Sequence, residues 1–275
     1  MRIFPLLLLL FSTLASAAPV ELQGQFVQGG LVFGKTMPGA RVVHDGEPVL
    51  VSPRGDFLIG FNRDAPEQSE LVIVLPDGNK EVRKLQVAQR NYRIQRIDGL
   101  PERKVTPRKE DQQRIKADRE AVKKARARRD QRIDFLQGFA WPAQGRISGV
   151  YGSQRILNGK PKWPHYGVDI AGPVGKPVRA PADGIVTLAH PDMFYSGATL
   201  IMDHGHGLSS TFLHLHKILV KEGQKVEKGQ IVAEMGASGR VTGPHLDWRM
   251  NLRGKRLDPQ LLVGPMISEK AENTK

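Results

Sequence analysis

The stretch GPHLDW at residues 243–248 alternates polar and apolar side chains. A period of two is that of a β-strand, so His245 and Asp247 share one face while Leu246 and Trp248 turn into a core. Glycines at positions 236, 239 and 243 allow the preceding loop unusual backbone conformations. The stretch therefore predicts a strand that carries a histidine and a carboxylate on one face.

From residue 139 onward, the sequence around this stretch also has the pattern of short β-strands separated by turns. Short strand candidates lie at 178–188, 198–203, 209–215 and 230–235, with turns between them. Such spacing predicts a compact antiparallel β domain over residues 139–265, followed by a flexible tail over 266–275. Seven of the eight histidines lie between His165 and His245, and this clustering is the first functional signal.

Two further segments bring histidine and aspartate together. In PHYGVD, residues 164–169, His165 and Asp169 are four apart and share a face, and Pro164 and Gly167 argue against a helix. Imidazole and carboxylate are both zinc ligands, so a metal-binding pair is one reading. In FLHLH, residues 212–216, alternation places His214 and the last histidine of the segment, His216, on the same face of a strand. The alternative is that this face belongs to a solvent-exposed strand edge.

Residues 18–100 predict a separate, small β-sandwich-like domain. Short apolar runs at 30–33, 41–43, 49–51, 57–61 and 71–75 alternate with turn signals rich in Gly, Pro and Asp. No catalytic pattern is found in this part of the sequence. His44 stands alone beside a turn, and we expect it at the surface.

Residues 101–138 predict a basic helical linker, with the helix itself over 107–137. The segment 107–137 has no internal glycine and ends before Gly138. Its apolar side chains form only a thin stripe, which is typical of a helix that connects domains.

The charge of the chain is concentrated in this linker. The whole sequence has 41 Lys+Arg against 28 Asp+Glu, and residues 103–132 contain thirteen basic and five acidic side chains. A basic segment is compatible with nucleic acid, but an exported protein meets anionic envelope polymers and lipid headgroups instead. We therefore expect no nucleic-acid partner, and a solvated charged helix is the simpler explanation.

Residues 1–17 predict a signal peptide. Met1 and Arg2 precede an apolar run, and Ala15-Ser16-Ala17 supplies the small residues of a cleavage site. The apolar run is shorter than the roughly 20 residues that cross a bilayer, so we expect no integral membrane segment after cleavage. The sequence has no cysteine, which excludes disulfides, thiolate metal sites and a lipid anchor on cysteine.

The pattern of residues 139–259 resembles the lysostaphin-like M23 metallopeptidases. That family has H-x-x-x-D, a histidine in a Y-x-H-L strand, and H-x-H, in this order. Further ordered matches are Trp141-Pro142, Tyr151-Gly152, Gly167-Val168-Asp169-Ile170, Asp183-Gly184, Asp203-His204-Gly205 and Thr242-Gly243-Pro244-His245-Leu246. The resemblance implies a zinc-dependent peptidase domain that is mainly antiparallel β.

The resemblance also implies roles for individual residues. His165 and Asp169 match the first two zinc ligands, and Asp247 stands where the third ligand is usually histidine. A carboxylate can bind zinc, so His165, Asp169 and Asp247 are the expected ligands of Zn²⁺. His214 and His245 match the catalytic histidines, although Phe212 replaces the usual tyrosine of the Y-x-H-L strand.

The other histidines have no role in the family pattern. His204 and His206 lie in a glycine turn, where bonding to the backbone is the simplest expectation. His190 is expected in a loop, and His216 at the rim of the site.

The implied function is zinc-dependent endopeptidase cleavage of peptide cross-links in bacterial peptidoglycan, with stem peptides as the substrate. The site lacks the glutamate of an H-E-x-x-H motif, so a histidine must move the proton. The alternative is a catalytically weak or inactive relative that activates cell-wall amidases, with amidases or other envelope proteins as partners. Export without a lipid anchor favours the periplasm of a Gram-negative bacterium.

Overall fold

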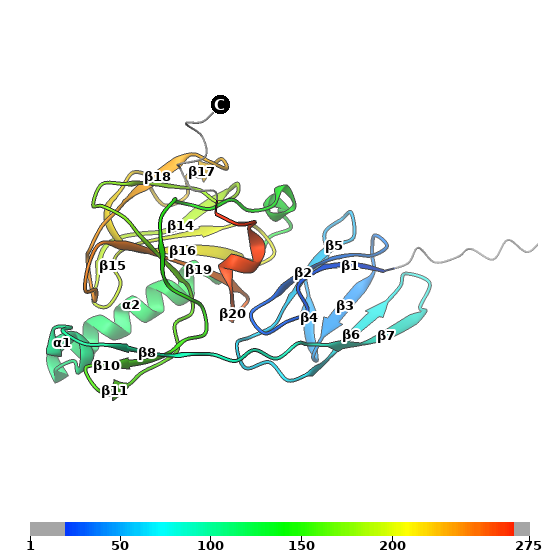
Figure 1. Cartoon of the computed structure of the whole chain (residues 1–275). Helices are drawn as coiled ribbons and strands as arrows, with labels where there is room; N and C mark the ends of the chain where they lie inside the picture. The colour runs from blue at the N-terminus through cyan, green and yellow to red at the C-terminus, as the bar shows by residue number, and fades with distance from the viewer. Residues whose placement is uncertain (1–19, 267–275) are drawn as a thin grey trace, which may run out of the picture.

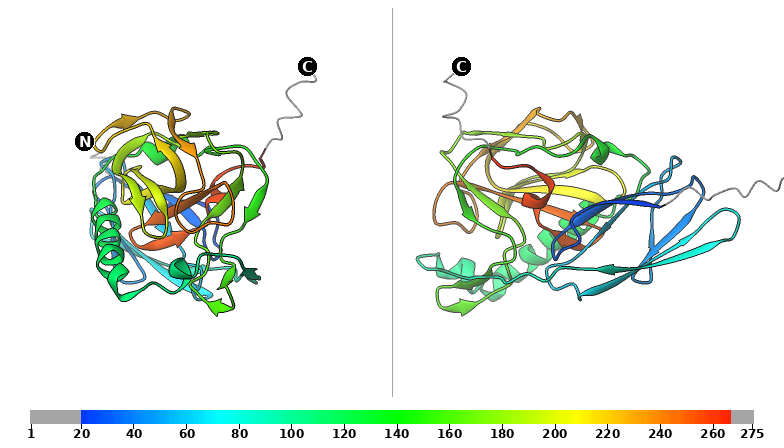
Figure 2. Two further views of the ribbon diagram at one scale, coloured as in Figure 1. Left: turned by 90° about the vertical axis from the view of Figure 1, so that its left-hand side faces the viewer. Right: turned by 45° about the vertical axis from the view of Figure 1, so that its right-hand side comes forward.

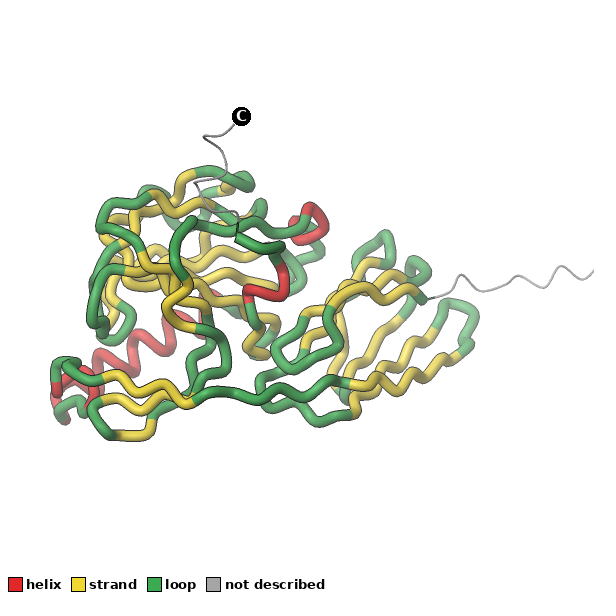
Figure 3. The backbone as a smooth tube through the Cα atoms, viewed as in Figure 1, coloured by secondary structure: helices red, strands yellow, loops and turns green. Residues whose placement is uncertain are grey.

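The structure, a computed structural model, describes residues 20–266 and consists mainly of β-strands (Figure 1). The expected signal peptide at 1–17 and all but the first residue of the tail at 266–275 lie outside this range. Within it, no helix is long and apolar enough to cross a membrane. Figure 3 shows how strongly strands prevail over helices in both halves of the chain.

The N-terminal part consists of two antiparallel sheets packed face to face. One sheet has the order β1-β2-β5 and the other β4-β3-β6-β7. Their bounds are β1 Glu21–Gly24, β2 Leu31–Lys35, β3 Arg41–His44, β4 Glu47–Val49, β5 Asp56–Gly60, β6 Gln68–Val74 and β7 Lys80–Gln86. The two-sheet arrangement is the small sandwich that the regularly spaced strands predict.

Alternating side chains and tight turns explain this sandwich. In β6, Leu71 and Ile73 point into the core between exposed or half-exposed neighbours. The turn before β5 needs Gly55, which has a φ of 90° and lies so close to Thr36 that a Cβ would be 1.9 Å from its carbonyl oxygen. Glycine alone accepts both conditions.

His44 is buried in this domain, so the expectation of a surface histidine is wrong. Only 1% of it is exposed. Its Nε2 lies 2.8 Å from the Ser69 Oγ, its Nδ1 lies 3.0 Å from the Lys255 Nζ, and its ring meets Phe61 edge-on. Lys255 belongs to the other domain, so sequence position alone could not reveal this partner.

The C-terminal domain is built on one large antiparallel sheet with the order β17-β14-β15-β16-β19-β12-β9, to which β13, β18 and β20 attach. The bounds are β9 Ile147–Gly149, β12 Val168–Ala171, β13 Pro177–Arg179, β14 Gly184–Met193, β15 Gly197–Asp203, β16 Leu208–Ile218, β17 Lys225–Val226, β18 Ile231–Met235, β19 His245–Leu252 and β20 Lys255–Leu257, with a 3₁₀ turn at Pro259–Leu262. One face of β16 and β19 packs Phe212, Trp248 and Leu246 into the core. The opposite face is therefore free to carry polar side chains.

The linker is less helical than the sequence predicts. It contains α1 (Glu102–Val105), a 3₁₀ turn at Lys109–Asp111, α2 (Gln112–Ala125) and a second 3₁₀ turn at Asp134–Gln137. The helix ends at Ala125 because the next segment of the chain packs along the loop after β15. There Arg132 ion-pairs with Asp203, and the His206 amide donates to the Asp130 carbonyl.

Helix α2 lies against the C-terminal domain and does not bridge open space (Figure 2). Ala121, Val122 and Ala125 pack on Leu188, Met193 and Ile201 of β14 and β15. The prediction of a simple connector is thus incomplete, because the helix also forms a wall of the larger domain.

The two domains are tied together by the strand β8 (Ile94–Ile97) and by contacts of β19 and β20. Strand β8 pairs in parallel with β10 (Gln154–Leu157), which also pairs with β11 (Lys160–Pro161). The Arg253 guanidinium donates to the Leu58 carbonyl at 2.8 Å, and Leu31 and Leu58 join the larger core.

Candidate metal centre

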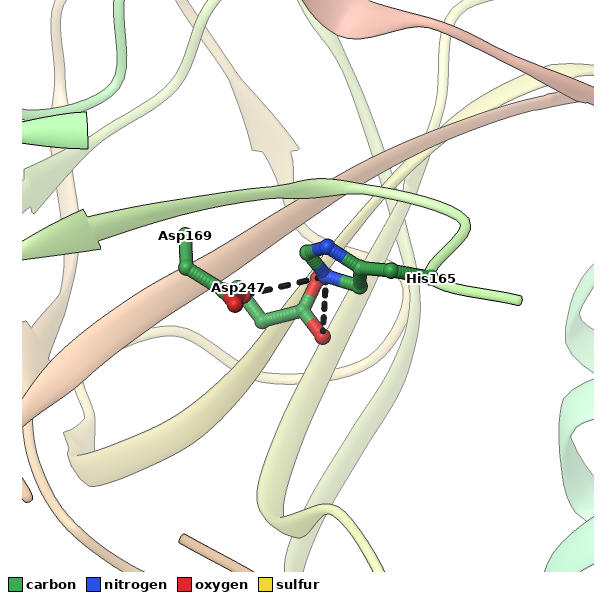
Figure 4. Close-up of side chains that lie close together, drawn as sticks. All are labelled: His165, Asp169 and Asp247. Atoms are coloured by element: carbon green, nitrogen blue, oxygen red, sulfur yellow. Dashed lines mark ion pairs between the residues drawn. The ribbon is translucent and has the colours of Figure 1, made fainter. Parts of the chain in front are cut away.

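The polar face of the large sheet brings the predicted metal ligands together. Asp169 of β12 lies directly opposite Asp247 of β19, and Asp247 lies opposite Leu213 of β16. Residues opposed across antiparallel strands share a face. His165 reaches the same point from the loop before β12, as Figure 4 shows.

Three donor atoms converge at this point. The His165 Nε2 lies 3.0 Å from the Asp169 Oδ1 and 3.4 Å from the Asp247 Oδ2. The side chains are buried, with 1%, 6% and 0% of His165, Asp169 and Asp247 exposed. Within residues 20–266 this is the one group of three or more His, Asp and Glu side chains with ligand atoms within 4.8 Å of one another.

Glycines make room for the two carboxylates. A Cβ on Gly149 would lie 2.1 Å from the Asp169 Oδ2, and one on Gly167 would lie 2.4 Å from the Asp247 Oδ1. Any larger residue at either position would push a carboxylate out of place. The local sequence is thus matched to this cluster of acids.

The bonding of His165 leaves its Nε2 available as a ligand. Its Nδ1 lies 3.3 Å from the Val150 carbonyl oxygen and donates to it, so Nε2 carries the lone pair. The Nε2 and the Asp169 Oδ1 are both buried without a hydrogen-bond partner. Buried polar atoms are rarely left unpaired, and a nitrogen and an oxygen that face each other in this way fit a shared cation.

The charges around His165 also favour a cation. Burial lowers the pKa of His165, but the carboxylates of Asp169 and Asp247 outweigh that effect, so its pKa is raised. The carboxylates therefore attract positive charge to the position of Nε2. The donor set, one imidazole and two carboxylates, suits zinc.

Two arginines that the sequence reading did not single out complete the cluster. The Arg155 guanidinium donates to the Asp169 Oδ2 at 2.7 Å, and Arg249 donates to both oxygens of Asp247, at 2.9 Å to Oδ1 and 2.5 Å to Oδ2. Burial raises the pKa of Asp247, but Arg249 and His165 hold it well below its usual range. Arg249 was detectable in principle, since it lies two residues after Asp247 on the same strand face.

Arg249 compensates the extra negative charge that the aspartate at position 247 brings to the ligand set. A His-Asp-His set has a formal charge of −1, and a His-Asp-Asp set has −2. The cation of Arg249 on Asp247 restores −1, so the pair takes the place of a neutral histidine.

His214 and His245 lie beside the three ligands. Their ring centroids are 4.9 Å apart, and the His245 Nε2 is 3.8 Å from the Asp169 Oδ1. Both rings donate from Nδ1 to a backbone carbonyl, His214 to Ser238 at 2.8 Å and His245 to Gly243 at 2.9 Å. In both rings the backbone thus engages Nδ1, and Nε2 is the nitrogen that remains for other contacts.

His214 is held in an unusual state. Its backbone φ is 64°, in the left-handed region that non-glycine residues rarely adopt. Burial lowers its pKa to about 4, so its ring is neutral near pH 7. Such backbone strain occurs preferentially at functional sites.

The remaining histidines lie elsewhere. His204 contacts the Asp183 carbonyl oxygen and the Ser210 Oγ through its two ring nitrogens. Neither ring nitrogen of the buried His206 has a partner, so the expectation of bonding to the backbone fails for that side chain. His190 lies in β14 and not in a loop, and His216 is exposed.

The family model of peptidase family M23 matches residues 163–259, which include all five site residues. A crystal structure described under the family name peptidase M23, from Pseudomonas aeruginosa, is 30% identical with a TM-score of 0.68. The match covers 86% of this chain and 95% of that one. This chain belongs to peptidase family M23.

Two curated relatives match less than half of this chain. The peptidoglycan DD-endopeptidases ShyA and ShyB of Vibrio cholerae are 38% and 41% identical, over 48% and 41% of this chain. The chain spans about a third or less of these relatives, 31% and 26% of their lengths. Zinc is the cofactor of M23 metallopeptidases, and the donor atoms described above fit it.

Proposed function

We propose that this protein is a zinc-dependent endopeptidase that hydrolyses the peptide cross-links of bacterial peptidoglycan. One observation carries the proposal: the Nε2 atoms of His165 and His245 and two buried carboxylates converge on one point, with the His214 ring beside them. The names of the related peptidoglycan DD-endopeptidases support the substrate class.

His165, Asp169 and Asp247 would hold the ion. When bound, zinc polarises a carbonyl and lowers the pKa of a coordinated water toward about 7. Arg155 and Arg249 fix the orientation of the two carboxylates through their hydrogen bonds. Partners of this kind orient metal ligands.

His214 and His245 divide the proton chemistry. The neutral His214 offers an Nε2 lone pair, which would accept the proton of the attacking water. The His245 Nε2 lies 3.8 Å from the Asp169 Oδ1, at the edge of the ligand cluster. From there His245 would stabilise the oxyanion that develops on the scissile carbonyl.

The alternative, an inactive activator of cell-wall amidases, is not favoured. Activation of another enzyme does not require the donor atoms to be aligned, whereas hydrolysis does. Here both carboxylates, their arginine partners and both histidines face one point. An amidase partner therefore stays secondary to hydrolysis in this proposal.

Location and domain division are also part of the proposal. The signal peptide over 1–17 supports export to the periplasm of a Gram-negative bacterium. The N-terminal domain would extend over 18–100, the basic linker over 101–138 and the peptidase domain over 139–265.

The test is cleavage of purified sacculi with metal content measured on the same samples. Wild-type protein should release muropeptides and contain close to one zinc per chain, and the His165→Ala variant should lose both. A matched control is His216→Ala, which removes an exposed imidazole from the same domain. Wild-type protein that holds no zinc and cleaves nothing, yet accelerates an amidase, would replace this proposal with the activator function.

A further inference from the structure

Beyond the metal centre, the polar face of the sheet forms the floor of a cavity. Thr211 of β16 lies opposite Arg249 of β19, and Ser209 lies opposite Asn251, all on the face of Asp247. Helix α2 forms a wall of a cavity of about 740 Å³ over this part of the sheet. The cavity thus combines the peptidase sheet with the linker helix.

The charged side chains that line the cavity are almost all basic. Asp118 is its one acidic lining residue, and that carboxylate accepts the Phe194 amide at 2.7 Å. The basic side chains that line it are Arg119, Lys123, Arg126, Arg129, Arg249, Arg253 and Arg256. Of these, Arg249 is neutralised by Asp247.

Arg126 is the strongest indication that the cavity binds an anion. One of its terminal nitrogens donates to the Thr211 Oγ1 at 2.8 Å, but its Nε is buried and has no acceptor. Burial and the nearby Arg256 and Arg249 lower its pKa. In the described part of the chain, no ion pair joins Arg126 or Arg256 to a carboxylate, whereas buried charges in proteins are normally paired.

The cavity adjoins the catalytic site. The neighbouring cavity, of about 860 Å³, is lined by His214 and Arg155 of the metal centre. The two cavities share Arg119, Tyr195, Leu213, Arg249 and Arg256 in their walls. An extended ligand bound at the metal centre would therefore reach the arginines under α2.

We propose that this arginine cavity binds free carboxylates of the peptide substrate that lie away from the scissile bond. The inference rests on the proposed function, since the position of the cavity beside the metal centre is what favours a peptide as the occupant. Guanidinium groups pair with carboxylates through two parallel hydrogen bonds. The enzyme would then prefer acidic cross-linked peptides to the same peptides with amidated carboxylates.

The first test compares two substrates and needs no change in the cavity. A synthetic cross-linked peptide with free carboxylates and its carboxamide form are titrated into the His245→Ala protein, which should bind without cleaving. The free acid should bind about tenfold tighter or more, as expected for lost charge-assisted hydrogen bonds. Equal affinity for the two peptides would overturn the proposal.

The second test places the preference in the cavity. Arg119→Gln with Arg126→Gln should reduce the preference to about twofold or less, because Arg126 has the buried Nε without an acceptor and Arg119 lines both cavities. The matched control is Lys116→Gln with Lys124→Gln, which removes the same charge from exposed positions of α2 outside the cavity lining. An equal loss in both double variants would show a general charge effect and contradict the site.

Two further outcomes separate the possible failures. If inorganic phosphate alone bound more tightly than the free-acid peptide, the cavity would be a phosphate site and the proposal would fall. If wild-type protein cleaved both peptides at equal rates, this inference would fail while the proposed function stood. If it cleaved neither but still bound the free acid selectively, the proposed function would fail instead.

Discussion

Two equally buried histidines, one in each domain, have different surroundings. In the N-terminal sandwich, His44 has partners at both ring nitrogens, Ser69 and Lys255. In the peptidase domain, the equally buried His165 keeps its Nε2 free and directs it at two carboxylates. Paired groups of the first kind stabilise a fold, whereas an unpaired atom that meets other donors indicates a binding site.

Convergence is the decisive part of this comparison. Both ring nitrogens of His206 also lack partners, but its ring packs edge-on against Phe135 and meets no ligand cluster. An unpaired buried nitrogen is therefore insufficient by itself. The metal centre is distinguished by donors that share one point.

The largest expected effect separates chemistry from metal binding within the peptidase domain. His214→Ala and His245→Ala should each slow muropeptide release by about 10²–10⁴-fold, the usual loss for an acid-base group. Zinc content should stay near one per chain because neither ring is a proposed ligand. Wild-type rates in both variants would remove these histidines from the mechanism.

Acid should destabilise both domains through their neutral histidines. Burial lowers the pKa of His44, His204 and His206 to about 4 each, against about 6.5 in the unfolded chain. The unfolded state therefore binds more protons between these values, so stability is full above pH 6.5 and falls as the pH drops toward 4. The loss is at most about 3 kcal/mol for each ring.

Urea denaturation at pH 7, 6, 5 and 4 measures this loss. A His204→Gln variant should show a shallower decrease than wild type, since it lacks one of the rings whose pKa burial lowers to about 4. A free energy of unfolding that does not change across this range would mean that the rings are protonated in the folded protein.

The contrast between the domains can be tested at His44 directly. His44→Ala should lower the free energy of unfolding by about 2–3 kcal/mol, because Ser69 and Lys255 lose a buried partner and a void is left. Zinc content and muropeptide release should not change. A fall in metal content of the folded variant would show that His44 is not a purely structural histidine.

The smallest effect, on zinc affinity, is expected when the neutral Asp247–Arg249 pair is replaced by a neutral histidine. The double variant Asp247→His with Arg249→Gln replaces the Asp–Arg pair with a histidine and keeps the formal charge of the site. Its zinc affinity, measured by calorimetry, should stay within about tenfold of wild type. Asp247→His alone should bind zinc more weakly, since it leaves the buried Arg249 without its carboxylate. Complete loss of zinc in the double variant would argue that Asp247 is not a ligand.

Local patterns predicted much of the fold and of the site. Alternation in residues 243–248 placed the polar and apolar faces of β19 correctly, and the M23 pattern marked the residues that converge. In residues 212–216 simple alternation failed, because Phe212 and Leu215 both lie in the core while Leu213 lies opposite Asp247. The strand is irregular there, with a φ of 64° at His214. The end of α2 at Ala125 was not predictable, because it depends on Arg132 meeting Asp203, which is distant in sequence. Arg155 was missed for the same reason, since β10 reaches Asp169 from a sheet formed with β8.

The linker shows the limit of composition as a guide. Its basic residues predicted a solvated connector, but Arg119 and Arg126 line a cavity beside the metal centre. Which side of a charged helix faces protein is decided by tertiary packing, here by Ala121 and Val122 against Met193 and its neighbours. Charge counts carry no information about that choice.

Zinc titration of chelated protein tests the central claim most directly. Purified protein is stripped with chelator and supplied with zinc in steps, and muropeptide release from sacculi is measured at each step. The rate should rise from near zero and level off at one equivalent of zinc per chain. Cleavage that persists without metal, or a stripped and folded protein that takes up zinc without regaining cleavage, would contradict a zinc peptidase built on His165, Asp169 and Asp247.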